Sequence, residues 1–530
     1  MGDPPTSSPS ARSTSTDPPG LDAPSVDPAA AFAGHPNRWR ILVVLCAALC
    51  VVVLDNTILA VAVPRVGHDL HADETALQWI TTAYSLVLAA FLLPLAGLGD
   101  RFGRRGLLLA GLVVFGASSG AAAMAASSGQ LILARGIQGI GGAATMPATL
   151  AVLGNVFPEH ERPRAIALWS GMSALAGAAG PVIGGLLLDH FWWGSVFLVN
   201  VPFCVMVFVA VVALVPTSKD PAAPPIDLVG SVVWSGALGL LLFGVIEGPV
   251  RGWSSAVVLG SWTVGVTLLV AFAGWERRSP HPLLSPKAVA DRRMQAGMVA
   301  MPAVFFSAFG VQFVVSQWLQ GVHRFSPLLS GACFVPHAFS VLGGSLLSTR
   351  LVRRIGLGRS SATGLAVLAG ALGFGALFHG SIPPILVAVV FVGLGIGLTC
   401  PPSVELIMAG VPPEQAGQAA GVNETLVEAG GAFGIAVMGS VLAAAAGGAA
   451  AIAPARLAGS SAAAVAARHT FTTSLTAPLV TAFVVLLVGA VVVIARTRGT
   501  DAWHPVDHLR DVVGAPEGGV IVVEPQGARP

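Results

Sequence analysis

The sequence predicts an all-α integral membrane protein that crosses the bilayer fourteen times. Of its 530 residues, 54% are hydrophobic and only 10% are charged, and the mean hydropathy is +0.79. Soluble domains carry about 25% charged residues. The apolar residues form fourteen runs, each close to the ~20 residues that a helix needs to cross a bilayer core. The runs are too long and too uniformly apolar for the strands of a membrane β-barrel.

The fourteen runs give the expected helices in chain order. They cover residues 41–63, 78–98, 107–127, 131–153, 165–188, 195–215, 228–247, 255–275, 296–318, 328–349, 360–379, 384–408, 418–443 and 475–495. Residues 1–40 are rich in Pro, Ser, Thr, Asp and Ala, and residues 497–530 have a similar composition. We expect both segments to be disordered tails.

The distribution of lysine and arginine sets the orientation. With the N-terminus in the cytoplasm, the cytoplasmic loops hold fifteen Lys and Arg residues. The outer loops then hold five, which are Arg65, Arg251, Arg324, Arg456 and Arg468. Basic residues concentrate in cytoplasmic loops, so both termini are expected in the cytoplasm, with the chain in a bacterial cytoplasmic membrane.

Several classes of protein are disfavoured by the sequence. It contains no P-loop and no HExxH motif, and its five cysteines form no CxxC pair. We therefore expect no enzyme, no metal site and no cofactor. A net charge of +2 does not point to nucleic acid as a partner. The expected partner is the lipid bilayer, and the membrane helices themselves must carry the function.

Two loops suggest an internal repeat. LGDRFGRR (98–105) follows the second run, and LVRRIGLGR (351–359) follows the tenth. Both have leucine, arginine and glycine at matching positions, which is typical of transporters built from repeated halves. The alternative is that any cytoplasmic loop collects arginines.

Further motifs lie in order along the first half. They are LDNTILAVAVP (54–64), GLGDRFGRR (97–105), LARGIQGIGGAA (133–144) and GMSALAGAAGPVIGG (171–185). Together they resemble the major facilitator superfamily, and within it the fourteen-span drug:proton antiporters that export quaternary ammonium compounds and other lipophilic cations. The resemblance covers about residues 41–496. One departure is DHFWWGSVFLVNVP (189–202), which lacks the arginine expected near its tryptophans.

The resemblance implies two six-helix bundles, residues 41–215 and 294–496. Residues 216–293 would supply linkers and two extra transmembrane helices. It also implies a monomer that works by alternating access about a central cavity, with protons and small hydrophobic or cationic compounds as its partners.

Charged residues inside the predicted helices are the first candidate functional groups. One such residue at a helix centre costs about 2.5–3.5 kcal/mol on insertion, so it normally faces a cavity or a partner. Asp55 and Arg135 lie at similar depths and could pair, either as a static ion pair or as a proton site. The resemblance implies a role for both in proton coupling.

Glu424 and Glu428 lie four residues apart and share one helix face. Protonation, a water-filled cavity or a bound cation would each relieve the cost of burying them. We expect both to take part in proton coupling and substrate binding. Glu428 is deeper and is the better candidate, because Glu424 is near enough to the inner interface to be merely solvated. Glu405 ends the twelfth run, where solvation and substrate binding are both open.

The remaining candidates are gating residues and aromatic side chains. The loop residues Asp100, Arg101, Arg104 and Arg105 could hold the cytoplasmic side closed, as the resemblance implies. Gly180 and Pro181 would allow a kink at a bundle contact, or would simply pack. Cation–π contact with a flat lipophilic cation is open to the aromatic residues Tyr84, Phe91, Phe305, Phe306 and Trp318.

The sequence therefore predicts a proton-coupled antiporter that exports lipophilic, cationic drugs or toxic compounds. One alternative is an exporter of a neutral or anionic natural product that protects its producer. Another is a proton-coupled uptake symporter, which the GPVIGG segment disfavours by resemblance.

Overall fold

The fold is that of a computed structural model, which describes Gly2 and residues 35–158, 161–217, 227–280, 289–410, 416–448 and 461–498. Within these residues, fourteen helical segments are long and apolar enough to cross a membrane, which confirms the predicted number. The two expected tails lie almost wholly outside the described residues.

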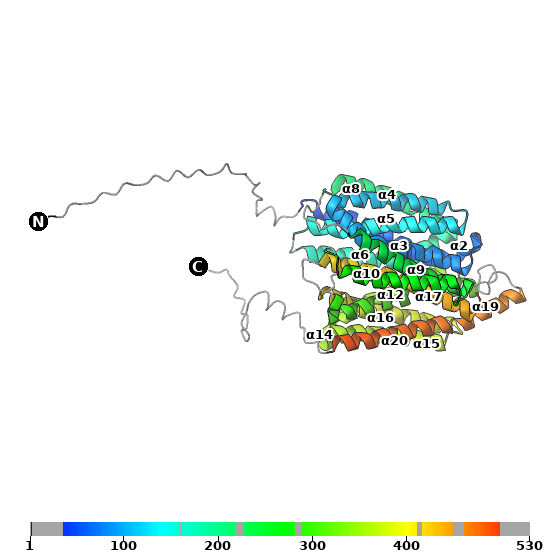
Figure 1. The fold of residues 1–530 in the computed structure, drawn as a ribbon. Helices are drawn as coiled ribbons and strands as arrows, with labels where there is room; N and C mark the ends of the chain where they lie inside the picture. Colours follow the sequence, from blue (N-terminus) through cyan, green and yellow to red (C-terminus); the bar gives the residue numbers. More distant parts are fainter. Residues whose placement is uncertain are drawn as a thin grey trace, which may run out of the picture.

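The first six spans form one group of helices, which we call the N-half (Figure 1, blue to green). The sixth span is broken at Val199, because Pro202 has no backbone N–H to bond to the carbonyl of residue 198. The helices are α2 (Arg38–Asp69), α3 (Glu74–Phe102), α4 (Arg104–Ala123), α5 (Ser128–Val156), α6 (Arg162–His190), α7 (Ser195–Leu198) and α8 (Asn200–Leu214).

The last six spans form the C-half (Figure 1, green to red). Its first helix ends in a π-helical turn, η1 (Trp318–Val322), and its second span is broken between Ala332 and Val335. The remaining helices are α12 (Arg292–Gln317), α13 (Pro327–Ala332), α14 (Val335–Ile355), α15 (Leu357–Leu377), α16 (Ile382–Met408), α17 (Ala416–Ala445), α19 (Ala462–Ser474) and α20 (Thr476–Thr497).

Two further helices, α9 (Leu228–Arg251) and α10 (Ala256–Glu276), lie between the halves in the chain. α9 packs against α3 of the N-half and α17 of the C-half, whereas α10 packs against α9. The polar contacts agree, since Trp79 of α3 donates to Glu247 of α9 at 3.3 Å and Ser440 of α17 donates to the Val245 carbonyl at 2.9 Å. α9 therefore covers one side of the seam between the halves.

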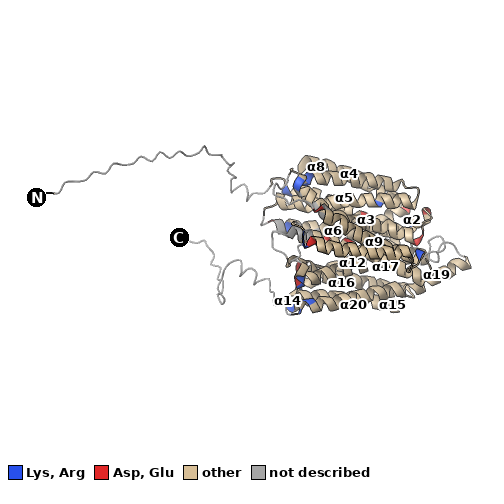
Figure 2. Ribbon diagram, in the orientation of Figure 1, with Lys and Arg blue, Asp and Glu red and all other residues tan. Residues whose placement is uncertain are grey.

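Lysine and arginine gather at one end of the helices (Figure 2). Basic residues begin α2, connect α3 to α4, and end α14 and α20. The opposite end has four described arginines, which are Arg65, Arg251, Arg324 and Arg468. By the positive-inside rule the arginine-rich end is cytoplasmic, and we call the other the outer end.

Three hydrogen bonds between described residues join the two halves near their outer end. Gln317 donates to Glu74 at 3.4 Å, Gln320 donates to the Val61 carbonyl at 2.9 Å, and Ser440 donates to Gln78 at 3.2 Å. The structure is therefore closed on its outer side.

Candidate functional site

A buried polar network occupies the interior of the N-half. Arg135 of α5 donates from Nη1 to Asp55 Oδ2 of α2 at 2.5 Å. The two side chains therefore form an ion pair, as their similar depths in the membrane suggested. Asp55 Oδ1 accepts from Gln138 Nε2 at 2.8 Å and from Asn200 Nδ2 at 2.6 Å. Gln138 also donates to Ser119 Oγ at 2.7 Å. All five side chains are buried, and they come from four helices.

The network satisfies Asp55 fully and Arg135 only in part. An ionised carboxylate accepts hydrogen bonds but donates none, and Asp55 receives three. Arg135 also donates from Nη1 to Gln138 Oε1 at 2.7 Å and from Nε to the Ile80 carbonyl at 3.3 Å. Its Nη2 is buried without a hydrogen-bond partner. The guanidinium group lies over the Tyr84 ring, with Cζ 4.4 Å from the ring centroid.

Glu428 of α17 faces this network across the seam between the halves. Its side chain is buried, and Oε2 has no hydrogen-bond partner. Ser85 of α3 lies beside it, and Arg135 is close enough to interact with it electrostatically. Within the described part of the chain, Glu428 forms no ion pair. The structure thus brings three sequence candidates, Asp55, Arg135 and Glu428, into one neighbourhood around Tyr84, which interacts with the charges of all three.

Glu424 has a different environment from Glu428, although the two share a helix face. It is partly exposed and lies near Asn423 and near Cys400 of α16, within the C-half. Glu405 is also partly exposed, in the last turn of α16 near the cytoplasmic end. Neither interacts with Arg135 as Glu428 does, so the structure separates the acid at the seam from two acids nearer the cytoplasm.

The aromatic candidates are dispersed. Tyr84 is buried under Arg135, and Phe91 is 39% exposed on α3. Phe305 and Phe306 belong to the packing of α12, where Phe305 contacts Phe309 edge-to-face with centroids 5.8 Å apart. Trp318 is fully buried, and its indole nitrogen donates to Thr472 at 3.2 Å. In this closed state they do not line one cavity together.

The predicted gating loop connects α3 to α4 through Gly103, whose φ of +122° suits glycine. The Asp100 side chain lies outside the described residues. Arg101 is exposed, whereas Arg104 and Arg105 donate to the carbonyls of Ala151 and Val212, at 3.3 and 2.7 Å. Arg104 and Arg105 thus connect α4 to α5 and α8 within the N-half and make no contact with the C-half through these bonds. A gating role for the loop stays a prediction.

Gly180 and Pro181 lie buried at a close helix contact. A Cβ at Gly180 would collide with Thr57 of α2, and a Cβ at Gly331 of α13 would collide with the Pro181 carbonyl. The contact between α6 and α13 joins the two halves at the outer end. Close packing is enough to explain both residues in this structure. That they let α6 bend during transport remains a prediction.

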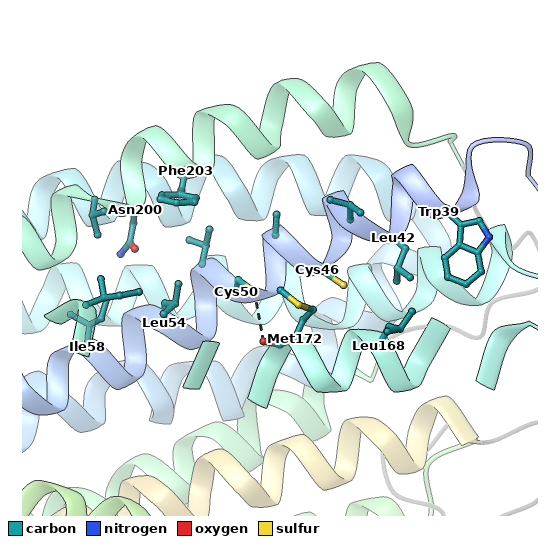
Figure 3. A pocket seen from close by; sticks show the side chains of 15 residues that line it. Trp39, Leu42, Cys46, Cys50, Leu54, Ile58, Leu168, Met172, Asn200 and Phe203 are labelled. Carbon is teal, nitrogen blue, oxygen red and sulfur yellow. Dashed lines mark hydrogen bonds between the residues drawn. The ribbon is translucent and has the colours of Figure 1, made fainter. Parts of the chain in front are cut away.

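A crevice of about 570 Å³ runs along α2, between α6 and α8 (Figure 3). It runs from Trp39 near the cytoplasmic end to Ile58 and Asn200, and its lining is almost entirely apolar. Phe203, Leu168 and Met172, which line it, are 37–46% exposed, so it opens to the side of the N-half. A cavity of about 20 Å³ lies in the seam itself, lined by residues of α2, α3, α12 and α17 such as Asn56, Thr81 and Gln312.

Three members of the buried network, Ser119, Gln138 and Asn200, were not singled out from the sequence. Gln138 lies three residues after Arg135, a spacing that places both on one helix face. Asn200 is the only amide in the FLVNVPF segment (197–203). A search for amides at helical spacing from a charged residue would have found Gln138, but nothing local marks Asn200.

Comparison with known proteins identifies relatives over most of the chain. It is 34% identical over 420 residues to the tetracenomycin C resistance and export protein of Streptomyces glaucescens, covering 79% of this chain and 78% of that protein. It is 34% identical over 413 residues to the multidrug efflux pump LfrA of Mycolicibacterium smegmatis, covering 77% and 82%. The multidrug resistance protein Stp of Mycobacterium tuberculosis is also 34% identical, over 415 residues and 77% of each chain.

Solved structures share the fold. A bacterial homologue of the human lysosomal transporter Spinster, in its inward-facing and unoccupied conformation, superposes with a TM-score of 0.63 at 18% identity, over 89% of this chain and 99% of that one. The model of the Major Facilitator Superfamily matches residues 45–435. With fourteen membrane helices and these relatives, the chain belongs to the Major Facilitator Superfamily and is a multi-pass membrane transporter.

Proposed function

We propose that the chain exports lipophilic cations from the cytoplasm in exchange for protons. The supporting observation is Glu428, a buried carboxyl group at the seam with one oxygen unpartnered. A buried carboxylate without a cation is costly, so such a group is stable either when protonated or when a cation lies beside it. These two states are the ones that an exchanger of protons and cations must alternate between. Relatives named as multidrug pumps support export as the direction.

In the proposed cycle, a cation enters from the cytoplasm and pairs with ionised Glu428, with Glu424 on the path. The loaded protein opens outward, and a proton from the outer solution neutralises Glu428 and releases the cation. The protonated carrier returns and gives its proton to the cytoplasm. Asp55 and Arg135 would keep the proton and cargo steps in sequence. A potential of 100 mV adds about 2.3 kcal/mol per net charge moved inward.

The test is ethidium transport in inverted membrane vesicles with an imposed proton gradient. We expect Glu428→Gln to abolish gradient-driven ethidium accumulation and Glu424→Gln to reduce it less. Glu247→Gln is the matched control, because Glu247 lies at the outer end and is paired with Arg251 at 2.7 Å. Full ethidium transport by Glu428→Gln would contradict the role given to that residue.

A second candidate substrate is a neutral natural product, exported by its producer for self-resistance. The relative named for tetracenomycin C export favours it. The same vesicles distinguish the two, since a set of lipophilic cations that fails to dissipate the gradient would exclude cation exchange and leave the neutral substrate. We propose a monomer in the cytoplasmic membrane of a bacterium in either case.

A further inference from the structure

A buried carboxyl group outside the proposed exchange site lies at the outer end of the seam. Glu74 is the first residue of α3, and its side chain is fully buried. Gln317 of α12 donates from Nε2 to Glu74 Oε1 at 3.4 Å, whereas Oε2 is buried without a hydrogen-bond partner. Gln78, one turn along α3, lies beside the carboxyl group. An acid of the N-half is therefore bonded only to neutral amides, one of them from the C-half.

The C-half covers this carboxyl group. On α12 the covering residue is Gln317, and on α17 Ser440 donates to Gln78 Oε1 at 3.2 Å. A Cβ at Gly439 would lie 2.5 Å from Gln78 Nε2, which shows how closely α17 approaches α3. We call these residues, Glu74, Gln78, Gln317, Gly439 and Ser440, the outer gate. When the halves separate at their outer end, these contacts break and Glu74 faces the outer solution.

The charged groups near the outer gate do not neutralise Glu74. The neighbouring Asp73 is an acid, so its charge opposes ionisation of Glu74. In the outer half of the helices that adjoin α3, the arginines are paired with other acids: Arg65 with Asp69, Arg135 with Asp55, and Arg251 with Glu247. Arg324 follows α12 and Arg468 lies in the last span, and neither forms an ion pair with Glu74. Burial lowers the pKa of the nearby His323, which opposes a positive charge on its ring.

The magnitudes favour a protonated Glu74 in the closed state. Desolvating an unpaired carboxylate costs several kcal/mol. The N-terminus of α3 offsets about 0.3–1 kcal/mol of this cost, and a hydrogen bond from an amide to a charged group offsets about 1.5–3 kcal/mol when its geometry is good. The bond from Gln317 is long, at 3.4 Å. Protonation removes the charge and with it the cost of desolvating a carboxylate.

We propose that Glu74 is a proton-binding group of the outer gate. It takes one proton from the outer solution as the gate closes and returns that proton to the outer solution when the gate opens. Because one proton is bound in the closed state and none in the open state, the closed-to-open ratio falls about tenfold per unit rise in outer pH. An acidic exterior therefore closes the gate whether or not substrate is present.

The experiment measures opening of the gate directly. Ser440→Cys is introduced into a chain whose five native cysteines are replaced, and a membrane-impermeant maleimide is applied to right-side-out vesicles without substrate between pH 5.5 and 8.5. Labelling rates are divided by those of Glu74→Gln in the same background, which corrects for ionisation of the thiol. We expect the corrected rate to rise by up to tenfold per pH unit while the gate is mostly closed. Glu74→Gln itself should label slowly, because a neutral side chain favours closure.

Two further variants make the result decisive. Glu74→Asp keeps a titrating group, so its labelling should retain the pH dependence with a shifted midpoint. Glu247→Gln removes a paired acid of the same end and should behave as the parent. The proposal is overturned if Glu74→Gln and the parent label with the same pH profile, or if Glu74→Asp shows no dependence. No substrate is present, so failure of drug export would leave this outcome unaffected.

Discussion

Replacing Gln138 with leucine tests how the buried network stabilises the N-half. Leucine keeps most of the side-chain volume but removes three hydrogen bonds. Gln138 donates to Asp55 at 2.8 Å and to Ser119 at 2.7 Å, and it accepts from Arg135 at 2.7 Å. The ion pair between Asp55 and Arg135 remains, because it does not pass through Gln138.

The expected loss follows from the number and kind of these bonds. Side-chain hydrogen bonds in a membrane protein contribute about 0.6 kcal/mol on average, so three of them set a lower value of about 2 kcal/mol. Two of the three involve charged groups, which contribute about 1.5–3 kcal/mol each, so with the third bond included the upper value is about 7 kcal/mol. Asn200→Leu removes one short bond to Asp55 and one contact of 3.4 Å to Ser119, and it should cost about half as much.

The measurement is the free energy of unfolding, from titration of the purified protein with SDS in mixed micelles. Thr145→Val is the control on the same helix, because its hydroxyl donates only to the Gly141 carbonyl, at 2.8 Å. A Gln138→Leu protein within about 0.5 kcal/mol of the parent, the size of an ordinary neutral substitution, would refute the reasoning. An equal loss in Thr145→Val would refute it as well, since the effect would then not come from the network.

Three further outcomes follow from packing and bonding elsewhere. Gly434→Ala should lose about 1–3 kcal/mol of unfolding free energy, because the added Cβ would collide with a backbone carbonyl of α12. Gly274→Ala is the control and should stay within about 0.5 kcal/mol of the parent, because the space around Gly274 is open. Tyr84→Phe should keep parental stability, because the hydroxyl has no partner in this state; lost transport in a stable Tyr84→Phe protein would place its role in another state. Trp275→Phe should lose about 1.5–3 kcal/mol of unfolding free energy in the same SDS titration, because the indole N–H donates to the Asp227 carboxyl group at 2.8 Å. An unchanged unfolding midpoint would contradict this.

The sequence was sufficient to predict the helices and the pairing of Asp55 with Arg135. Both rest on strong effects, since long apolar runs have few stable alternatives in a bilayer and a charge inside a span needs a partner. Depth counted along two antiparallel helices placed the two residues at one level. The same counting ranked Glu428 above Glu424, and the structure places Glu428 at the seam and Glu424 among residues of its own half.

The other parts of the site depend on which face each helix turns toward the interior. A helix that is apolar on all sides carries no sequence pattern that reveals this face. The aromatic candidates could not be assigned to a cavity, because most residues beside Phe91, Phe305 and Phe306 in the sequence are also apolar. Glu74 was missed for another reason. The apolar run that predicted the second span begins at residue 78, whereas α3 begins four residues earlier, capped by Asp73, which accepts from the Ala76 amide at 2.8 Å. An acid read as part of a loop thus lies inside the protein.

Three of the buried acids differ in a way that bears on proton exchange. Asp55 has an arginine and two amides as donors, so a proton or a cargo cation would have to displace existing bonds. Glu428 and Glu74 each have an unpartnered oxygen and no cation bonded within the described residues. Arg135 has an unpartnered Nη2 and interacts with Glu428 across the seam. A proton, a cargo cation and Arg135 are therefore competing partners for Glu428. Such competition couples the two halves, because Arg135 belongs to one of them and Glu428 to the other.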